Sequence, residues 1–312
     1  MAEHFVQPPH WEWYIAGYFF CAGLAGGSYT LSTMLRLWGT PRDEGVARLG
    51  FLIAFPLVVV CGILLTIDLG QPLRFWHMMI NTTPGETGVN FKYWSPISLG
   101  TWALLLFSPF AFVSFLEALA LDGRIRLPAL TRTLSGTAGR VFDVVGSLVA
   151  LFLASYTGVV LSVSNQPEWS DSWAIGGLFV ASALSGSAAL LALLGRSRPG
   201  AESVEPRLQI AEGYFALIEL VMLAVFFLTL AAAGTVGKEL SGVWLVLWIL
   251  VVASLVPPLV SALGGGRRVQ LASGGETVVT SSATAGMSTA EAVAVIVGVF
   301  LMRIAVVFSA QF

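Results

Sequence analysis

A long apolar run ends in the stretch Thr66-Ile67-Asp68-Leu69-Gly70-Gln71-Pro72-Leu73-Arg74-Phe75-Trp76. Gly70 and Pro72 predict that a helix stops there, because glycine adopts turn conformations readily and proline lacks a backbone N–H. A polar chain segment at membrane depth is tolerated only where protein or a polar cavity surrounds it, so an ionisable residue there is a candidate functional site. The alternative is a simple helix end, with Asp68 and Arg74 paired or hydrated at the lipid headgroups.

The composition indicates a membrane protein. The 312-residue chain is 56% hydrophobic and 11% charged, with a mean hydropathy of +0.82. A soluble domain carries about 25% charged residues, which excludes that class. The formal net charge of −2 does not provide the basic face that a nucleic-acid partner requires.

Eight apolar segments are each long enough for a spanning helix, which needs about 20 residues. We therefore predict an all-α, polytopic membrane protein, with eight transmembrane helices in a bundle that forms a single transmembrane domain over residues 1–312. The approximate spans are 13–35, 49–67, 93–117, 142–164, 172–195, 213–234, 241–263 and 291–311.

The basic residues predict the orientation of the chain, since short cytoplasmic loops are enriched in Lys and Arg. Twelve of the 16 basic residues fall in alternate connections: Arg36, Arg42, Arg48, Arg124, Arg126, Arg132, Arg140, Arg196, Arg198, Arg207, Arg267 and Arg268. The other connections contain only Arg74, Lys92 and Lys238. Both termini and the Asp68 loop are therefore expected on the outer, periplasmic side of a cell (inner, cytoplasmic) membrane.

Two further features concern packing. Residues 68–94 form a long outer loop, whose apolar residues favour a short helix lying in the membrane interface. Small residues recur at Gly23–Gly27 and Ser182–Gly186, a pattern that favours close approach of helix backbones.

Polar and aromatic residues gather at the predicted outer ends of several helices. His10, Tyr14 and Tyr18 lie at the start of the first span, Asp68 ends the second, and Tyr156 lies in the fourth. Tyr14 and Tyr18 are four residues apart and share a helix face. An apolar cavity with a few convergent hydrogen-bonding groups is typical of a small-ligand site. The alternative is an aromatic belt at the membrane surface.

Charged residues also occur within or near the spans on the inner side. Glu117, Glu219 and Arg303 suggest an inward-facing path for protons, because buried ionisable groups in membranes often relay them. The alternative is internal ion pairing or contact with the inner surface. The three histidines, His4, His10 and His77, all lie outside the spans, so we expect neither a haem with two axial histidines nor a metal site.

Five segments together resemble the NrfD/PsrC family of quinone-interacting membrane subunits. They are Gly23–Gly27, Asp68–Trp76, Trp94–Trp102, Tyr156–Leu161 and Leu178–Gly186. The Asp-Leu-Gly-x-Pro-x-Arg-Phe element is the most specific of them.

The resemblance implies a membrane anchor without haem that exchanges electrons between menaquinone or ubiquinone and a ferredoxin-like iron–sulfur subunit on its outer face. That subunit would pass the electrons to or from a molybdopterin catalytic subunit or a multihaem cytochrome. By position, Tyr14, Tyr18, Asp68 and Tyr156 would form the quinone pocket beside His10. Asp68 would be the catalytic proton acceptor, and Arg74 would hold Asp68 ionised or seat the partner.

Two other functions remain open at this point. A proton- or ion-translocating or scaffold subunit of a redox complex, without its own quinone site, would depend on Glu117, Glu219 and Arg303 rather than on Asp68. A secondary transporter would require inverted repeats, and residues 1–160 and 161–312 show no convincing internal symmetry.

Overall fold

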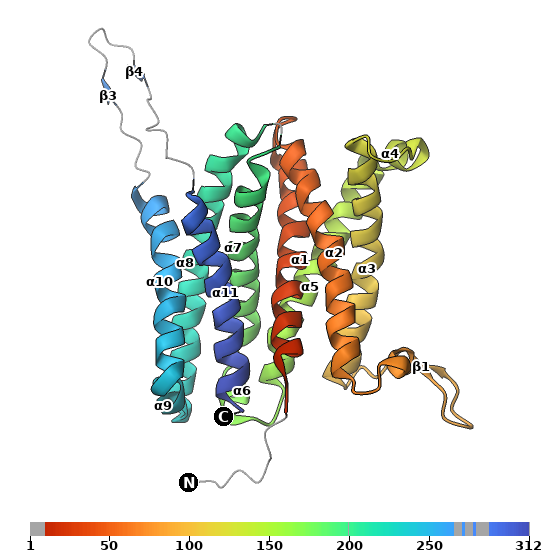
Figure 1. The fold of residues 1–312 in the computed structure, drawn as a ribbon, viewed down its shortest axis with the longest axis vertical. Helices are drawn as coiled ribbons and strands as arrows, with labels where there is room; N and C mark the ends of the chain where they lie inside the picture. Colours follow the sequence, from red (N-terminus) through yellow and green to blue (C-terminus); the bar gives the residue numbers. More distant parts are fainter. Residues whose placement is uncertain (1–9, 199, 265–269, 272–276, 279–286, 312) are drawn as a thin grey trace.

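The protein is an almost entirely helical bundle. The computed structural model describes residues 10–198, 200–264, 270–271, 277–278 and 287–311 (Figure 1). Within this part of the chain, the long helices are α1 (Trp13–Trp38), α2 (Glu44–Asp68), α3 (Pro96–Leu121), α5 (Thr137–Ser162), α7 (Ile175–Gly195), α8 (Ala201–Ala233), α10 (Gly242–Gly264) and α11 (Thr289–Ser309). The short elements are η1 (Pro72–Met78), α4 (Pro128–Leu134), α6 (Pro167–Ser170), α9 (Val236–Glu239), and the two-stranded hairpins β1 (Ile80–Asn81)–β2 (Gly88–Val89) and β3 (Gln270–Leu271)–β4 (Thr277–Val278).

Seven of the described helices are long and apolar enough to cross a membrane: α2, α3, α5, α7, α8, α10 and α11. The first predicted span forms the 26-residue α1, which runs beside them but is not one of the seven (Figure 1). Glycine, serine and threonine make up much of its second half, and these residues are buried against other helices. The protein is therefore polytopic, and α1 as an eighth span remains a prediction.

The long helices form two groups of four. In the first, α1 packs against α2 and α5, and α3 closes the ring by packing against both α2 and α5. In the second, α7, α8, α10 and α11 pack in a similar ring. The two groups meet where α1 and α5 contact α7 (Figure 1).

Small residues allow α1 and α7 to come close together, and the two small-residue runs of the sequence, Gly23–Gly27 and Ser182–Gly186, lie on these two helices. A Cβ atom on Gly27 would lie 2.5 Å from the carbonyl oxygen of Ala183, and one on Gly23 would lie 3.3 Å from the Ala183 methyl group. On a neighbouring face of α1, a Cβ atom on Gly26 would lie 2.6 Å from the carbonyl oxygen of Ala150 in α5. A larger side chain at Gly26 or Gly27 would force the helix backbones apart.

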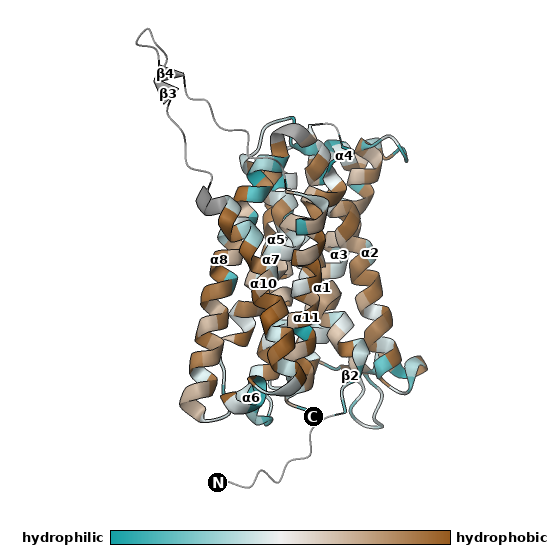
Figure 2. Cartoon of the chain, turned by 60° about the vertical axis from the view of Figure 1, so that its left-hand side comes forward, coloured by the Kyte–Doolittle hydropathy of each residue, from teal (hydrophilic) through white to brown (hydrophobic). Residues whose placement is uncertain are grey.

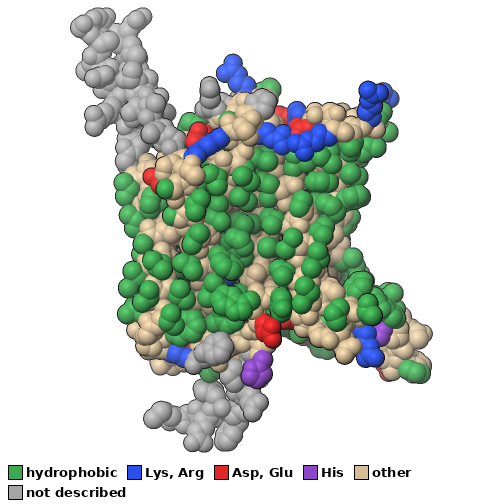
Figure 3. Space-filling view, viewed as in Figure 1, with side chains coloured by type: hydrophobic (Ala, Val, Ile, Leu, Met, Phe, Trp, Pro, Cys, Tyr) green, Lys and Arg blue, Asp and Glu red, His purple; other side chains and the backbone are tan. Residues whose placement is uncertain are grey.

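The two ends of the bundle differ in charge. Apolar residues cover the middle of the helices, and hydrophilic residues lie toward both ends (Figure 2). We call the end at which α1 begins and α2 and α11 finish the Asp68 end. The opposite end, where arginines gather above the apolar belt, is the arginine end (Figure 3).

Several helices extend beyond their predicted spans at the arginine end. Helix α2 begins at Glu44 rather than at residue 49, and α8 begins at Ala201 rather than at residue 213. These extra turns carry charged residues, and the predicted spans left them out because they were based on apolar runs. The predicted short helix in the loop after Asp68 is present as η1, a 3₁₀ helix followed by the hairpin β1–β2.

Candidate ligand site at the Asp68 end

A cavity of about 380 Å³ lies at the Asp68 end, between α1, α2, α3, α5 and η1. Most of its wall is apolar, with Trp11, Ile15, Phe19, Leu65, Leu104, Met78 and Met79 among the lining residues. Six polar side chains also line it: Tyr18, Thr66, Asp68, Thr101, Ser108 and Tyr156. This volume and composition fall within the usual range for small-ligand sites.

Asp68 is the last residue of α2 and lines the cavity. The helix ends there because Gly70 has a φ of +63°, a left-handed conformation that glycine adopts without strain, and Pro72 then starts η1. In the described part of the chain, the Asp68 carboxylate forms no hydrogen bond and no salt bridge within 4.0 Å. It is therefore available to a ligand.

Two of the tyrosines named in the sequence analysis, Tyr18 and Tyr156, line the cavity, and both are buried. The Tyr156 hydroxyl donates a hydrogen bond to the backbone carbonyl of Pro96 at the start of α3. Its ring lies against Gly100, where a Cβ atom would lie 2.2 Å from the ring. The Tyr18 hydroxyl has no hydrogen-bond partner among the residues that the structure describes. Tyr18 can therefore donate to a ligand, while Tyr156 is fixed in place.

Three other residues of the predicted pocket do not line the cavity. Tyr14 is 36% exposed and lies outside the cavity lining, one turn before Tyr18 on α1. His10 precedes α1 and is exposed. Arg74 lies on η1, is also exposed, and forms no salt bridge with Asp68.

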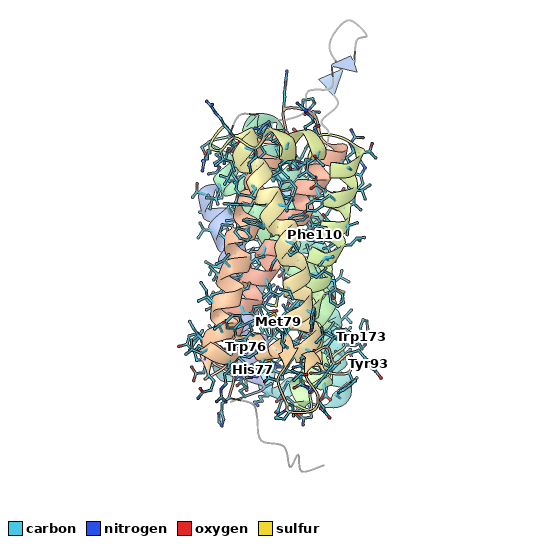
Figure 4. All side chains as sticks on the ribbon, turned by 90° about the vertical axis from the view of Figure 1, so that its right-hand side faces the viewer. Trp76, His77, Met79, Tyr93, Phe110 and Trp173 are labelled. Atoms are coloured by element: carbon cyan, nitrogen blue, oxygen red, sulfur yellow. The ribbon has the colours of Figure 1, made fainter. Side chains whose placement is uncertain are left out.

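The segment after Asp68 closes one side of the cavity. Helix η1 contributes Phe75 and Met78 to the lining, and Met79 follows directly. Figure 4 shows Met79 near the ends of α2 and α3, with Trp76 and His77 close by at the same end of the bundle. The rings of Trp76 and His77 pack edge to face, with a distance of 4.0 Å between their centroids. The short helix thus forms part of the wall of the site.

Residues missed by the sequence interpretation lie on α3. Gly100, Thr101, Leu104, Leu105 and Ser108 all line the cavity. Their spacing of one, three, one and three residues is that of one helix face, and small or hydroxyl side chains recur on it. This pattern, in an otherwise apolar span, is the sequence feature from which these α3 residues could have been predicted to line a cavity.

The second half of the bundle braces the wall that α1 provides. The Trp11 ring stacks on Trp169 with a centroid distance of 4.9 Å. The backbone N–H of Trp11 donates to Gln311 Oε1 at 2.7 Å, and Trp169 Nε1 donates to the carbonyl of Val306 at 2.6 Å. The start of α1 is therefore fixed to α6 and to the end of α11.

The charged residues of the predicted proton path lie in two separate clusters. Glu117 belongs to the first, at the arginine end, where Arg36 Nη1 lies 2.7 Å from Glu117 and 3.3 Å from Asp143. Arg36 Nη2 also lies 3.2 Å from Glu44. This cluster joins α1, α2, α3 and α5 at the end of their ring opposite the cavity.

Glu219 and Arg303 belong to the second cluster, within the other ring of helices. Arg303 is fully buried, donates to the carbonyl of Phe179 at 3.0 Å, and lies 3.8 Å from the Phe179 ring centroid. Glu219 is 1% exposed, and its Oε2 has no hydrogen-bond partner in the described residues. On the same helix, the fully buried Glu212 accepts a hydrogen bond from Ser185 at 3.4 Å. Arg303 thus lies inside the bundle rather than in lipid.

The fold defines a polytopic membrane protein with a largely apolar cavity at one end of its helical bundle. The family described as "Polysulphide reductase, NrfD" matches residues 3–312. The chain belongs to this family. In the described residues, no group of three or more His, Cys, Asp or Glu side chains is placed to hold a metal ion.

Three curated relatives show how far the similarity extends. The C chain of the polysulfide reductase from Wolinella succinogenes is 29% identical over 184 residues, which cover 56% of this protein and 55% of that relative. Protein NrfD of Escherichia coli is 27% identical over 272 residues, which cover 82% and 77%. The C subunit of the selenate reductase from Mesobacillus selenatarsenatis is 33% identical over 76 residues, which cover 24% and 18%. The similarity thus spans about half of the polysulfide reductase relative and about three quarters of NrfD.

Proposed function

We propose that this protein is the membrane subunit of a respiratory reductase complex and exchanges electrons with menaquinone or ubiquinone in the cavity at the Asp68 end. The names of its relatives, subunits of polysulfide and selenate reductases, support membership of such a complex. By this proposal α1 is the eighth span, the Asp68 end faces the periplasm, and the protein lies in the cell membrane. The excess of arginine at the opposite end supports this orientation.

The observation that carries the proposal is the unpaired Asp68 carboxylate beside an apolar cavity, within the part of the protein that the structure describes. By contrast, Glu117 and Asp143 of the same ring of helices share a guanidinium. Leu105 both lines the cavity and is 42% exposed on the helix surface. A lipid-soluble ligand can therefore reach the cavity between α2 and α3.

Quinol oxidation requires the removal of two electrons and two protons. Asp68 accepts a proton from one quinol hydroxyl as a general base. Tyr18 donates a hydrogen bond to the carbonyl oxygen that forms, and Tyr156, whose proton is held by Pro96, accepts a hydrogen bond through its oxygen. The second proton leaves to water at the Asp68 end. Quinone reduction uses the same groups in reverse.

The electrons need a partner, because the resemblance implies a membrane anchor without a redox group of its own. We propose a ferredoxin-like iron–sulfur subunit docked at the Asp68 end, the end of the bundle nearest the cavity. It would connect to a molybdopterin catalytic subunit or to a multihaem cytochrome. Exposed apolar side chains on the loop after Asp68, including Leu73 at 89% exposure, are available to such a partner.

The test compares two substitutions of the same kind. Asp68→Asn keeps the size of the side chain and removes the base, so quinol oxidation by the complex is expected to fall at least about 100-fold. Asp171→Asn is the matched control, because Asp171 follows α6 at the same end and does not line the cavity. Assembly of the complex is expected to be unchanged in both. Full quinol activity in Asp68→Asn would refute the assignment.

A second candidate function is proton translocation, which the buried acids of α8 favour. Glu212 and Glu219 each have an oxygen without a hydrogen-bond partner in the described residues, and Ser185 connects to Glu212 from α7. Glu117 lies in the separate Arg36 cluster and would not belong to this path. In vesicles, Glu219→Gln would then abolish proton uptake coupled to electron transfer while Asp68→Asn retained it. The opposite result would favour the quinone site alone.

A further inference from the structure

A second, larger recess lies at the arginine end, far from the quinone cavity. It is a groove of about 780 Å³ between the α1–α2 connection, the end of α3 and the α7–α8 connection. Its lining includes four arginines, Arg42, Arg48, Arg124 and Arg198, and two acids, Glu44 and Asp122. Neither the proposed electron exchange nor the proton path uses this groove.

Two of the arginines hold the groove together. Arg198 lies 2.5 Å from Asp122 Oδ2, and Arg48 lies 3.4 Å from Asp122 Oδ1. Arg48 also donates to the backbone carbonyl of Leu121 at 3.2 Å and pairs with Glu44 at 3.2 Å. Asp122 and Glu44 are therefore neutralised by bonds that tie α2, α3 and the α7–α8 connection into one rigid base.

The other two arginines have no such partners. Arg42 and Arg124 are exposed, line the same groove, and form no salt bridge or side-chain hydrogen bond with any residue that the structure describes. Because both acids in the described lining are already paired, the four arginines give this lining an excess of two positive charges. Such an excess attracts an anion with several acceptor oxygens.

The position of the groove indicates which anion. Arginines gather along this edge of the molecule, directly above the apolar belt that faces lipid (Figure 3). Leu121, which lines the groove, is 40% exposed and continues the apolar surface of α3. Guanidinium groups bind phosphate oxygens in pairs, and basic pockets at the cytoplasmic ends of membrane helices bind anionic lipid headgroups.

We propose that this groove binds the phosphodiester headgroup of an anionic phospholipid through Arg42 and Arg124. The acyl chains of the lipid would lie along the apolar surface of α3 below Leu121. The bound lipid would then join the ring of α1, α2, α3 and α5 to the α7–α8 connection.

The experiment measures lipid retention by the purified full-length protein with native mass spectrometry. Wild-type protein is compared with the double variant Arg42→Gln/Arg124→Gln in micelles that contain equal phosphatidylglycerol and phosphatidylcholine. The matched control is Arg126→Gln/Arg132→Gln, which removes the same charge from the same end of the molecule but outside the groove. Inorganic phosphate is added in a separate arm, with thermal unfolding as its readout.

Wild-type and control proteins are expected to retain more phosphatidylglycerol than phosphatidylcholine. In the groove variant, the ratio of retained phosphatidylglycerol to phosphatidylcholine is expected to fall at least about tenfold. Phosphatidylglycerol is also expected to raise the unfolding temperature of wild-type protein, and phosphate alone to leave it unchanged. Equal lipid preference in the two double variants would overturn the proposal. So would a phosphate arm that reproduces the whole thermal shift, because the site would then bind a free anion.

Discussion

The hydroxyl group of Tyr156 donates a hydrogen bond to the backbone carbonyl of Pro96, and this bond ties α5 to the start of α3 beside the cavity. The Tyr156 ring occupies the space that Gly100 leaves by having no side chain. Tyr18 faces the same cavity from α1 without a described protein partner for its hydroxyl. We therefore expect the substitutions Tyr156→Phe and Tyr18→Phe to have different effects.

Tyr156→Phe is expected to lower stability and to weaken quinone exchange moderately. It removes one buried hydrogen bond, which contributes about 1 kcal/mol to the free energy of unfolding. The ring still fills the space at Gly100, so the cavity keeps its shape. Thermal unfolding in detergent and quinol kinetics measure the two effects. Unchanged stability would show that the bond to Pro96 is not formed in the folded protein.

Tyr18→Phe is expected to show the reverse pattern. No described protein hydrogen bond is lost, so the free energy of unfolding changes by less than about 0.5 kcal/mol. A hydrogen bond to the quinone oxygen is lost, and the KM for quinol rises about tenfold. If the variant binds quinol as the wild type does, Tyr18 does not contact the ligand.

Gly100→Ala is expected to disrupt the site through Tyr156. The added methyl group would lie 2.2 Å from the Tyr156 ring, so the ring must move into the cavity. Quinol activity is predicted to fall at least about tenfold, as small displacements in a binding site can cause. Gly62→Ala is the control, because Gly62 also lines the cavity but has no atom within 4 Å of the new methyl group. Equal activities in the two variants would contradict this role of Gly100.

Asp122 predicts a pH-dependent contribution to stability. Partial burial raises the pKa of this carboxyl, but the hydrogen bonds and charges of Arg198 and Arg48 outweigh that effect, so its pKa lies below the ordinary value. An acid with a lowered pKa in the folded state stabilises the protein above its unfolded-state pKa, about 3.9, and loses this contribution as the pH falls through the folded-state pKa. Wild-type protein is therefore expected to unfold at a higher temperature than Asp122→Asn at pH 7. The difference should shrink below about pH 4. A constant difference would refute the linkage.

The sequence predicted the helices well, because charge-free runs of this length have few other structures available. The small residues at Gly23–Gly27 and Ser182–Gly186 predicted close approach of helix backbones, but the sequence did not show that α1 and α7 would be the partners. Of the residues named for the quinone pocket, Asp68, Tyr18 and Tyr156 line one cavity, and their binding of quinone stays a prediction. The end of α2 was predicted from Gly70, which adopts a left-handed conformation without strain, and from Pro72, which cannot donate a backbone hydrogen bond.

The rotation of each helix about its axis could not be predicted in the same way. In a membrane, both the lipid-facing and the buried faces of a helix are apolar, so the sequence does not show that Tyr18 is buried while Tyr14, one turn earlier on the same side of α1, is 36% exposed. The sequence also did not show that Glu117 and Glu219 lie in separate clusters, because the partners of each acid depend on which helices are neighbours in the bundle. Arg36, which holds Glu117, lies 81 residues away in the sequence.

The position of bound quinone tests the central claim most directly. A cryo-EM map of the complex with quinone added is predicted to show the headgroup between Asp68, Tyr18 and Tyr156, with its tail leaving between α2 and α3. An ordered quinone bound elsewhere on this protein, with the cavity filled by protein side chains, would contradict the assignment.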